Sequence, residues 1–155
     1  MKIVFSRSNT FISWSIRIGT KSEWSHVDML FPDGTLIGAL GTGVERTTLQ
    51  DRFRTHPISQ YRIDEINLKD ELRAREFAEA QVGKPYDYTA ILAFMTPWRT
   101  DWNDDAKWFC AELAAATAAE GGVTVARESM ARVTPQFLAV NPLLRTIAPT
   151  QRPVR

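Results

Sequence analysis

The longest apolar run with helical character covers residues 110–120, and its first residue, Cys110, is the only cysteine in the chain. Alanine dominates this run and two glycines close it, so we expect a helix that begins at Cys110. A thiol in the first turn of a helix feels the positive end of the helix dipole, which favours the thiolate over the thiol. The sequence therefore predicts a fold that presents a sulfur at the start of a packed helix.

The composition is that of an ordinary globular protein. The 155 residues are 44% hydrophobic and 24% charged, which suits one domain with a sizeable core. The formal net charge of +1 gives no whole-chain field that would recruit nucleic acid or anionic membrane. No apolar run approaches the ~20 residues that span a bilayer, and the N-terminus does not resemble a signal peptide. We expect a cytoplasmic location by default, or a phage-encoded protein or one delivered by other means, and the oligomeric state stays open.

Strand signals dominate the first half of the chain and helix signals the second. We expect strands at residues 2–6, 26–31, 35–40, 44–49 and 59–66, and helices at residues 11–19, 50–55, 68–82, 89–95, 110–120, 128–132 and 136–140. The helix at 68–82 should bury an apolar stripe of Leu68, Leu72, Phe77, Ala78 and Val82. Segregated strands and helices favour an α+β fold. We expect one domain over residues 1–148 and a frayed tail over residues 149–155.

Two histidines are available to activate the thiol. His26 opens a strand next to a loop, whereas His56 precedes a proline in a polar connection and is expected at the surface. Acyl transfer by cysteine needs a thiolate, a nearby base and donors for an oxyanion. Taken singly, Cys110 is also typical of a small core residue, and His26 of a structural strand histidine.

Four short motifs occur in the order found in one known family. Residues 20–27 read T-x-S-x-x-S-H-V, residues 83–87 read G-x-x-Y-D, residues 109–113 read F-C-A-E-L against the family's F-C-S-E-L, and residues 134–138 read T-P-x-x-L. With these motifs the chain resembles the circularly permuted branch of the NlpC-type papain-like hydrolases. This branch is the YiiX-like group, which is related to lecithin:retinol acyltransferase.

The resemblance implies a circularly permuted papain-like α+β fold, in which an antiparallel sheet packs against helices and the nucleophile lies at a helix N-terminus. It implies that Cys110 is the nucleophile and His26 the general base, with the Cys110 backbone N–H as an oxyanion donor. The implied reaction is hydrolysis of an amide, peptide or ester bond through an acyl-enzyme, without a cofactor. Peptidoglycan peptides and acyl or lipid substrates are the implied classes.

One position departs from the family pattern. The family orients its histidine with a third polar residue on the strand after the turn, and the matching position here is Gly38. The substitute could be Asp28, which shares a strand face with His26 by period-two spacing, or Glu45, a backbone carbonyl or water. A missing orienting residue weakens catalysis without abolishing it. The alternative is therefore a catalytically weak or inactive binding or assembly module, for example one associated with a phage or a cell envelope.

Aromatic residues near these motifs are candidates for a substrate cleft, namely Tyr86, Trp108 and Trp24. The tryptophan- and aspartate-rich segment 98–108 suits either a ligand cleft or a loop packed on its own aromatic rings. Asp87 is expected to cap the following helix, and Glu112 to make a structural hydrogen bond or ion pair rather than to take part in catalysis.

Other chemistries lack support in the sequence. One cysteine and two histidines provide no four-ligand zinc signature, so we expect no metal site. The Gly41-Thr42-Gly43 segment lacks the lysine and the following helix of a phosphate-binding loop. The chain has no basic stripe that would bind nucleic acid.

Overall fold

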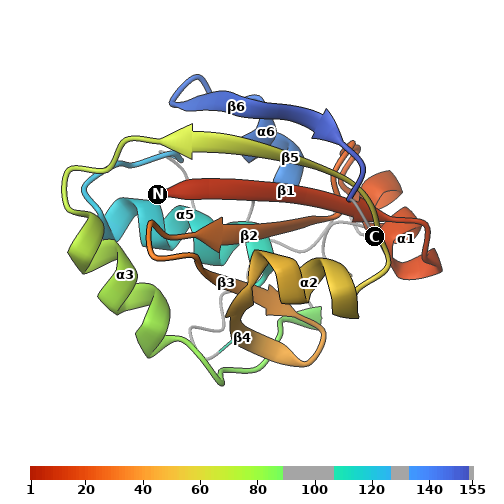
Figure 1. Cartoon of the computed structure of the whole chain (residues 1–155), viewed down its shortest axis with the longest axis horizontal. Coiled ribbons are helices and arrows are strands. Elements are labelled where there is room, and N and C mark those ends of the chain that lie inside the picture. Colours follow the sequence, from red (N-terminus) through yellow and green to blue (C-terminus); the bar gives the residue numbers. More distant parts are fainter. Residues whose placement is uncertain (89–106, 127–132, 154–155) are drawn as a thin grey trace, which may run out of the picture.

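The computed structural model describes residues 1–88, 107–126 and 133–153, and these residues form a six-stranded sheet with the order β4-β3-β2-β1-β5-β6 (Figure 1). Every pair of neighbouring strands is antiparallel. This sheet with its helices confirms the expected α+β class. The strands are β1 Lys2–Ser8, β2 His26–Leu30, β3 Thr35–Leu40, β4 Gly43–Thr48, β5 Ile58–Ile66 and β6 Leu144–Gln151.

The hairpin of β2 and β3 carries the candidate site. Gly34 has a φ of 85° in the turn between the strands, a conformation that glycine adopts without a steric penalty. In the register of the hairpin, Met29 pairs with Ile37 and Leu30 with Leu36. Continuing this register by one residue places residue 28 opposite residue 38.

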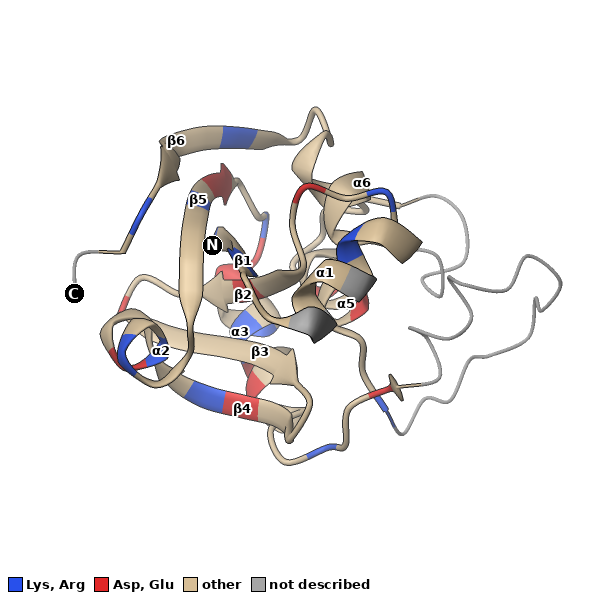
Figure 2. Cartoon of the chain, turned by 90° about the vertical axis from the view of Figure 1, so that its right-hand side faces the viewer, with Lys and Arg blue, Asp and Glu red and all other residues tan. Residues whose placement is uncertain are grey.

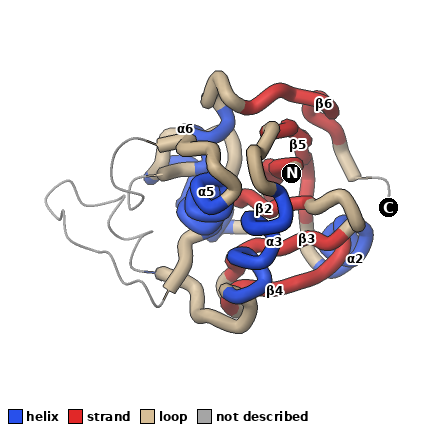
Figure 3. Tube along the Cα trace, turned by 90° about the vertical axis from the view of Figure 1, so that its left-hand side faces the viewer, coloured by secondary structure: helices blue, strands red, loops and turns tan. Residues whose placement is uncertain are grey.

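Helices lie on both sides of the hairpin. Helix α5 (Cys110–Glu120) packs against β2 and β3, and α2 (Leu49–Thr55) lies on the opposite side of this part of the sheet (Figures 1 and 3). Three further helices are α1 (Phe11–Gly19), α3 (Glu71–Ala80) and α6 (Pro135–Ala139). The hairpin can therefore receive side chains from α5 on one side and from α2 on the other.

Helix α5 has the bounds predicted from the sequence. Its buried residues are mostly alanines, whose small side chains let the helix approach the sheet and α3 closely. On α3, Ala74 and Ala78 are buried, whereas Leu72 is 67% exposed. The predicted apolar stripe is therefore wrong at Leu72, because the face of α3 that packs on α5 is the alanine face. It is also wrong at Val82, which is 40% exposed and lies beyond the end of α3.

Several boundaries also differ from expectation. The predicted frayed tail is wrong for residues 149–151, because they belong to β6, which pairs with β5. Helix α2 begins at Leu49, one residue before the predicted start, and Thr48 caps it by accepting a hydrogen bond from the Asp51 N–H at 3.2 Å. The predicted helices at 89–95 and 128–132 and the loop at 96–105 lie outside the described residues.

Candidate active site

His26 and Asp28 form the centre of the site. They lie on the same face of β2, and Nε2 of His26 is 2.9 Å from Oδ1 of Asp28. The Asp28 side chain is fully buried, whereas the His26 side chain keeps a little contact with solvent. Asp28 is therefore the carboxylate that contacts His26, as one of the sequence alternatives anticipated.

Gly38 leaves room for this carboxylate. A Cβ atom added at Gly38 would lie 1.9 Å from Oδ1 of Asp28, which is far inside van der Waals contact. The same Cβ atom would lie 3.4 Å from Nε2 of His26. Position 38 thus faces the imidazole, and the Asp28 carboxylate occupies the space that a side chain there would need.

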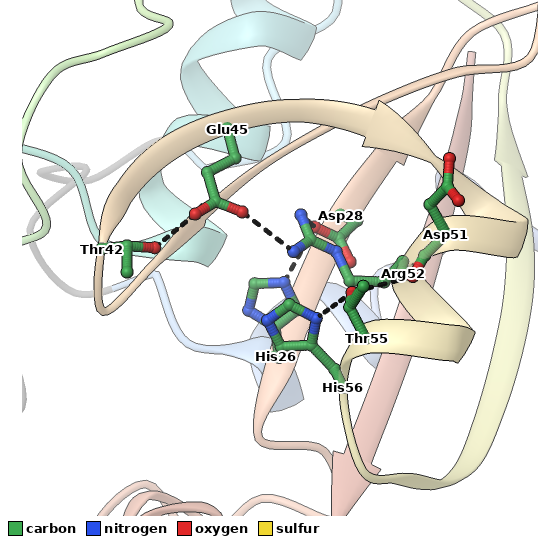
Figure 4. Close-up of polar contacts among 8 residues, drawn as sticks. All are labelled: His26, Asp28, Thr42, Glu45, Asp51, Arg52, Thr55 and His56. Carbon is green, nitrogen blue, oxygen red and sulfur yellow. Dashed lines mark hydrogen bonds and ion pairs between the residues drawn. The ribbon is translucent and has the colours of Figure 1, made fainter.

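Arg52, on α2, is a site residue that the sequence analysis missed. Its side chain is only 2% exposed, and its Nη2 lies 3.3 Å from Oδ1 of Asp28. Its Nη1 lies 3.4 Å from Oε2 of Glu45 on β4. Basic and acidic residues lie side by side on α2 and β4 (Figure 2), and Figure 4 shows the Arg52 guanidinium between the two carboxylates.

Glu45 contacts Arg52 and the Thr42 hydroxyl, and no contact between Glu45 and His26 is found among the described residues. Of the two residues predicted as candidates for orienting the histidine, Glu45 can therefore reach His26 only through Arg52 and Asp28. The charges alternate along the chain of contacts from Glu45 through Arg52 and Asp28 to His26.

The environment shifts the pKa values of both central residues. Burial alone would lower the pKa of His26, but the charge and hydrogen bond of Asp28, followed by the hydrogen bond and charge of Cys110, raise it from 6.5 to about 10. Burial alone would raise the pKa of Asp28, but the charge and hydrogen bond of His26 and the charge of Arg52 lower it below 3.8. Both groups are therefore charged at neutral pH.

Cys110 is the first residue of α5, and from the helix N-terminus it is near enough to His26 to raise the pKa of the imidazole. Glu112 accepts a hydrogen bond from the backbone N–H of Phe109 at 3.5 Å, which supports this end of the helix and confirms its predicted structural contact. The cysteine is 1% exposed. Its backbone N–H has no intrahelical acceptor in an α-helix, so it is available as a donor at the sulfur.

The three aromatic candidates have different surroundings. Tyr86 is buried beside the site, and burial followed by the nearby Cys110 charge raises its pKa well above 10. Trp108 donates a hydrogen bond from Nε1 to Gln81 at 3.1 Å. Trp24 is a core residue whose ring packs against Phe5, so its predicted place in a cleft is wrong.

A cavity of about 280 Å³ reaches His26. Its wall includes His26, Arg52, His56 and Tyr86, together with apolar side chains of α1, β3 and β5. His56 was expected at the surface, and it lies in this wall. Burial and the charge of Arg52 lower the pKa of His56 from 6.5. Trp24 and Trp108 are not part of the wall.

Neither Arg52 nor His56 carries a motif that distinguishes it. Arg52 stands between two other charged residues, Asp51 and Arg54, and such a pattern usually indicates an exposed helix. Their place in the site follows from the packing of α2 over the hairpin, which is a tertiary contact. The sequence alone does not show that Arg52 is buried; its burial becomes visible only in the structure.

The described residues do not fit a metal centre. Within residues 1–88, 107–126 and 133–153, no three His, Cys, Asp or Glu side chains are grouped to hold a metal ion. The Asp28 oxygen that faces His26 is also paired with the Arg52 guanidinium, which already supplies a positive charge there.

Among the described helices, none has both the length and the apolarity to cross a bilayer.

These elements define an α+β protein in which a cysteine lies near a histidine where a helix meets an antiparallel sheet. Comparison with solved structures shows that the fold is similar to that of YiiX from Escherichia coli O157:H7, which is described as a metalloprotein of DUF1105. The TM-score is 0.73 at 20% sequence identity, and the match covers 98% of this chain and 97% of that chain. No family model and no curated protein matches the sequence.

Proposed function

We propose that this protein is a cysteine hydrolase of the circularly permuted papain-like type, in which Cys110 is the nucleophile and His26 the general base. The observation that carries the proposal is that the His26 imidazole pairs with the buried carboxylate of Asp28 and has its pKa raised further by the nearby Cys110. Nucleophile, base and orienting acid form the arrangement that activates a weak nucleophile. The four sequence motifs and the similarity to the YiiX fold support the permuted topology.

The reaction proceeds in two steps. The Cys110 thiolate attacks the substrate carbonyl carbon, and the C–N or C–O bond breaks as the His26 imidazolium gives its proton to the leaving amine or alcohol. Water then attacks the thioester while His26 takes its proton, which releases the acid and restores the thiolate. The Cys110 backbone N–H, at the positive end of α5, stabilises the oxyanion in both steps.

The ring nitrogens have separate tasks in this mechanism. Nε2 of His26 is paired with Asp28, so Nδ1 is the nitrogen left to exchange a proton with the sulfur. The cavity that His26 lines is the proposed site for the acyl or peptide part of the substrate. Peptidoglycan peptides and acyl or lipid esters or amides are the proposed substrate classes.

A specific observation favours a second candidate function, a binding or assembly module on the same fold. Cys110 is 1% exposed and is not part of the cavity wall among the described residues. A sulfur that substrate cannot reach would behave as a core residue. The term metalloprotein describes YiiX and is not carried over to this chain. For this chain we propose metal-free chemistry, since the described His, Cys, Asp and Glu residues offer no ligand cluster.

Trapping of the acyl-enzyme tests the proposal. The purified protein is mixed with an activated ester or with peptidoglycan peptide fragments, and its intact mass is followed by mass spectrometry. We expect an acyl adduct on Cys110 that forms quickly and decays, and none in Cys110→Ala. A folded protein that forms no adduct with any of these substrates would contradict the hydrolase and support the binding module. One equivalent of bound metal in the purified protein would contradict metal-free chemistry.

A further inference from the structure

Position 38 and the Asp28 carboxylate compete for one place in the site. Continued by one residue, the hairpin register puts residues 28 and 38 opposite each other on neighbouring strands. A Cβ atom on residue 38 would lie 1.9 Å from Oδ1 and 2.9 Å from Cγ of Asp28. Since Asp28 is fully buried, its carboxylate has no solvent into which it can turn aside. The structure can therefore hold a carboxylate on residue 28 or a side chain on residue 38.

Arg52 is the second part of this arrangement. One carboxylate oxygen of Asp28 lies 2.9 Å from Nε2 of His26 and 3.3 Å from Nη2 of Arg52. Taking a guanidinium out of water is costly, and a buried ion pair is seldom a net gain in stability over apolar residues. The burial of Arg52 is therefore better explained by its effect on the position of the Asp28 carboxylate than by a gain in stability.

We propose that Arg52 is a positioning residue that fixes the Asp28 carboxylate beside His26, and that the missing side chain at position 38 makes room for this arrangement. The inference rests on the proposed cysteine hydrolase. It assigns the orientation of His26 to a carboxylate on its own strand, held from behind by α2. Glu45 completes the arrangement by anchoring Arg52 on its other side.

A stability cycle tests the competition at position 38 without reference to activity. We expect Gly38→Ala to lower the melting temperature of the wild type by about 5 °C or more, because its new methyl group overlaps Asp28. In the Asp28→Ala/Arg52→Met background, where the charged pair is removed as a unit, the same substitution should cost less than about 2 °C. An equal drop in melting temperature in the two backgrounds would show that residues 28 and 38 do not compete for space.

Moving the carboxylate from residue 28 to residue 38 tests the same competition, with the reactivity of the Cys110 thiol as the readout. We expect Asp28→Ala to slow alkylation of Cys110 by iodoacetamide at pH 6 by about tenfold or more. Asp28→Ala/Gly38→Asp should recover at least half of that loss on a logarithmic scale, since a side chain on residue 38 begins 3.4 Å from Nε2 of His26. A folded double variant with no recovery would contradict the proposal.

The positioning role of Arg52 has its own test. Arg52→Met removes a cation that lowers the pKa of Asp28, so the loss of Cys110 reactivity at low pH should move upward by about one pH unit. Arg52→Lys should restore most of the profile. Arg54→Met is the matched control on the same helix, because Arg54 is exposed and pairs with Asp51 instead. An unchanged profile in folded Arg52→Met would overturn the role.

If Arg52→Met does not fold, Glu45→Gln loosens Arg52 from its exposed side and should shift the profile in the same direction by a smaller amount. The two proposals fail in different ways. An inert Cys110 in the wild type contradicts the hydrolase, whereas a reactive Cys110 that depends on His26 but not on Arg52 contradicts only the positioning role.

Discussion

Nε2 of His26 lies 2.9 Å from Oδ1 of Asp28, two residues further along the same strand. The two side chains share a strand face, so β2 alone supplies both the proposed base and the carboxylate beside it. In the proposed mechanism, α5 then has only to bring the sulfur. This division would explain how a glycine can stand at the position where the family that the sequence motifs resemble places its third residue.

The ion pair makes the stability of the fold depend on pH. The pKa of His26 is about 10 in the folded protein, against 6.5 for the unperturbed side chain. A raised pKa means that the imidazolium stabilises the fold fully below pH 6.5, and that this contribution is lost as the pH rises toward 10. Urea denaturation should therefore show a free energy of unfolding that falls across this window, by at most about 1.4 kcal/mol per pH unit from this group.

His26→Gln should flatten this dependence between pH 6.5 and 10. His56→Gln serves as the control, because the pKa of His56 is lowered and its titration lies below that window. The same slope in wild type and His26→Gln would show that other groups cause the dependence.

Asp28→Asn should impair catalysis much more than it impairs folding. The amide fills the same space, but it cannot stabilise the imidazolium as a carboxylate does, and it leaves Arg52 with one anionic partner fewer. In a comparable triad the same change costs several orders of magnitude, so we expect turnover to fall at least about 100-fold. Steady-state hydrolysis of an ester substrate measures the loss. Asp33→Asn, in an exposed turn, should leave turnover unchanged.

The cavity should set the affinity for substrate. Leu40 lines the cavity at the end of β3 and is only partly buried, so Leu40→Trp should narrow the cavity without disturbing the core. We expect KM for a long-chain or peptide substrate to rise about tenfold or more, with little change for iodoacetamide, which is small. Leu143→Trp, at an exposed position elsewhere, is the control. Unchanged KM in Leu40→Trp would place the substrate outside this cavity.

The sequence predicted the elements that have strong local signals. The turn around Gly34 gave the β2–β3 hairpin, and the alanine-rich run gave α5 with both of its ends. The helix α6 was predicted from Thr134, which caps it, and from the proline that follows. In each case the signal lies within a few residues of the boundary that it marks.

The parts of the structure that were missed depend on distant contacts. Strand β6 has three exposed residues for each partly buried one and contains a proline, so only its pairing with β5 makes it a strand. Arg52 looks like a surface residue until α2 packs over Asp28. Period-two spacing placed Asp28 on the face of His26, but it could not choose between Asp28 and Glu45, because that choice rests on the position of Arg52.

The most direct test of the central claim is the pH dependence of Cys110 alkylation in wild type and His26→Ala. The chain has one cysteine, so the mass of the modified protein reports on this thiol alone. We predict a wild-type rate whose midpoint lies well below the ~8.5 of an unperturbed thiol, and a midpoint that returns toward that value in His26→Ala. A Cys110 that stays unreactive until the protein unfolds, with or without His26, would show that the sulfur is a core residue and would contradict the account.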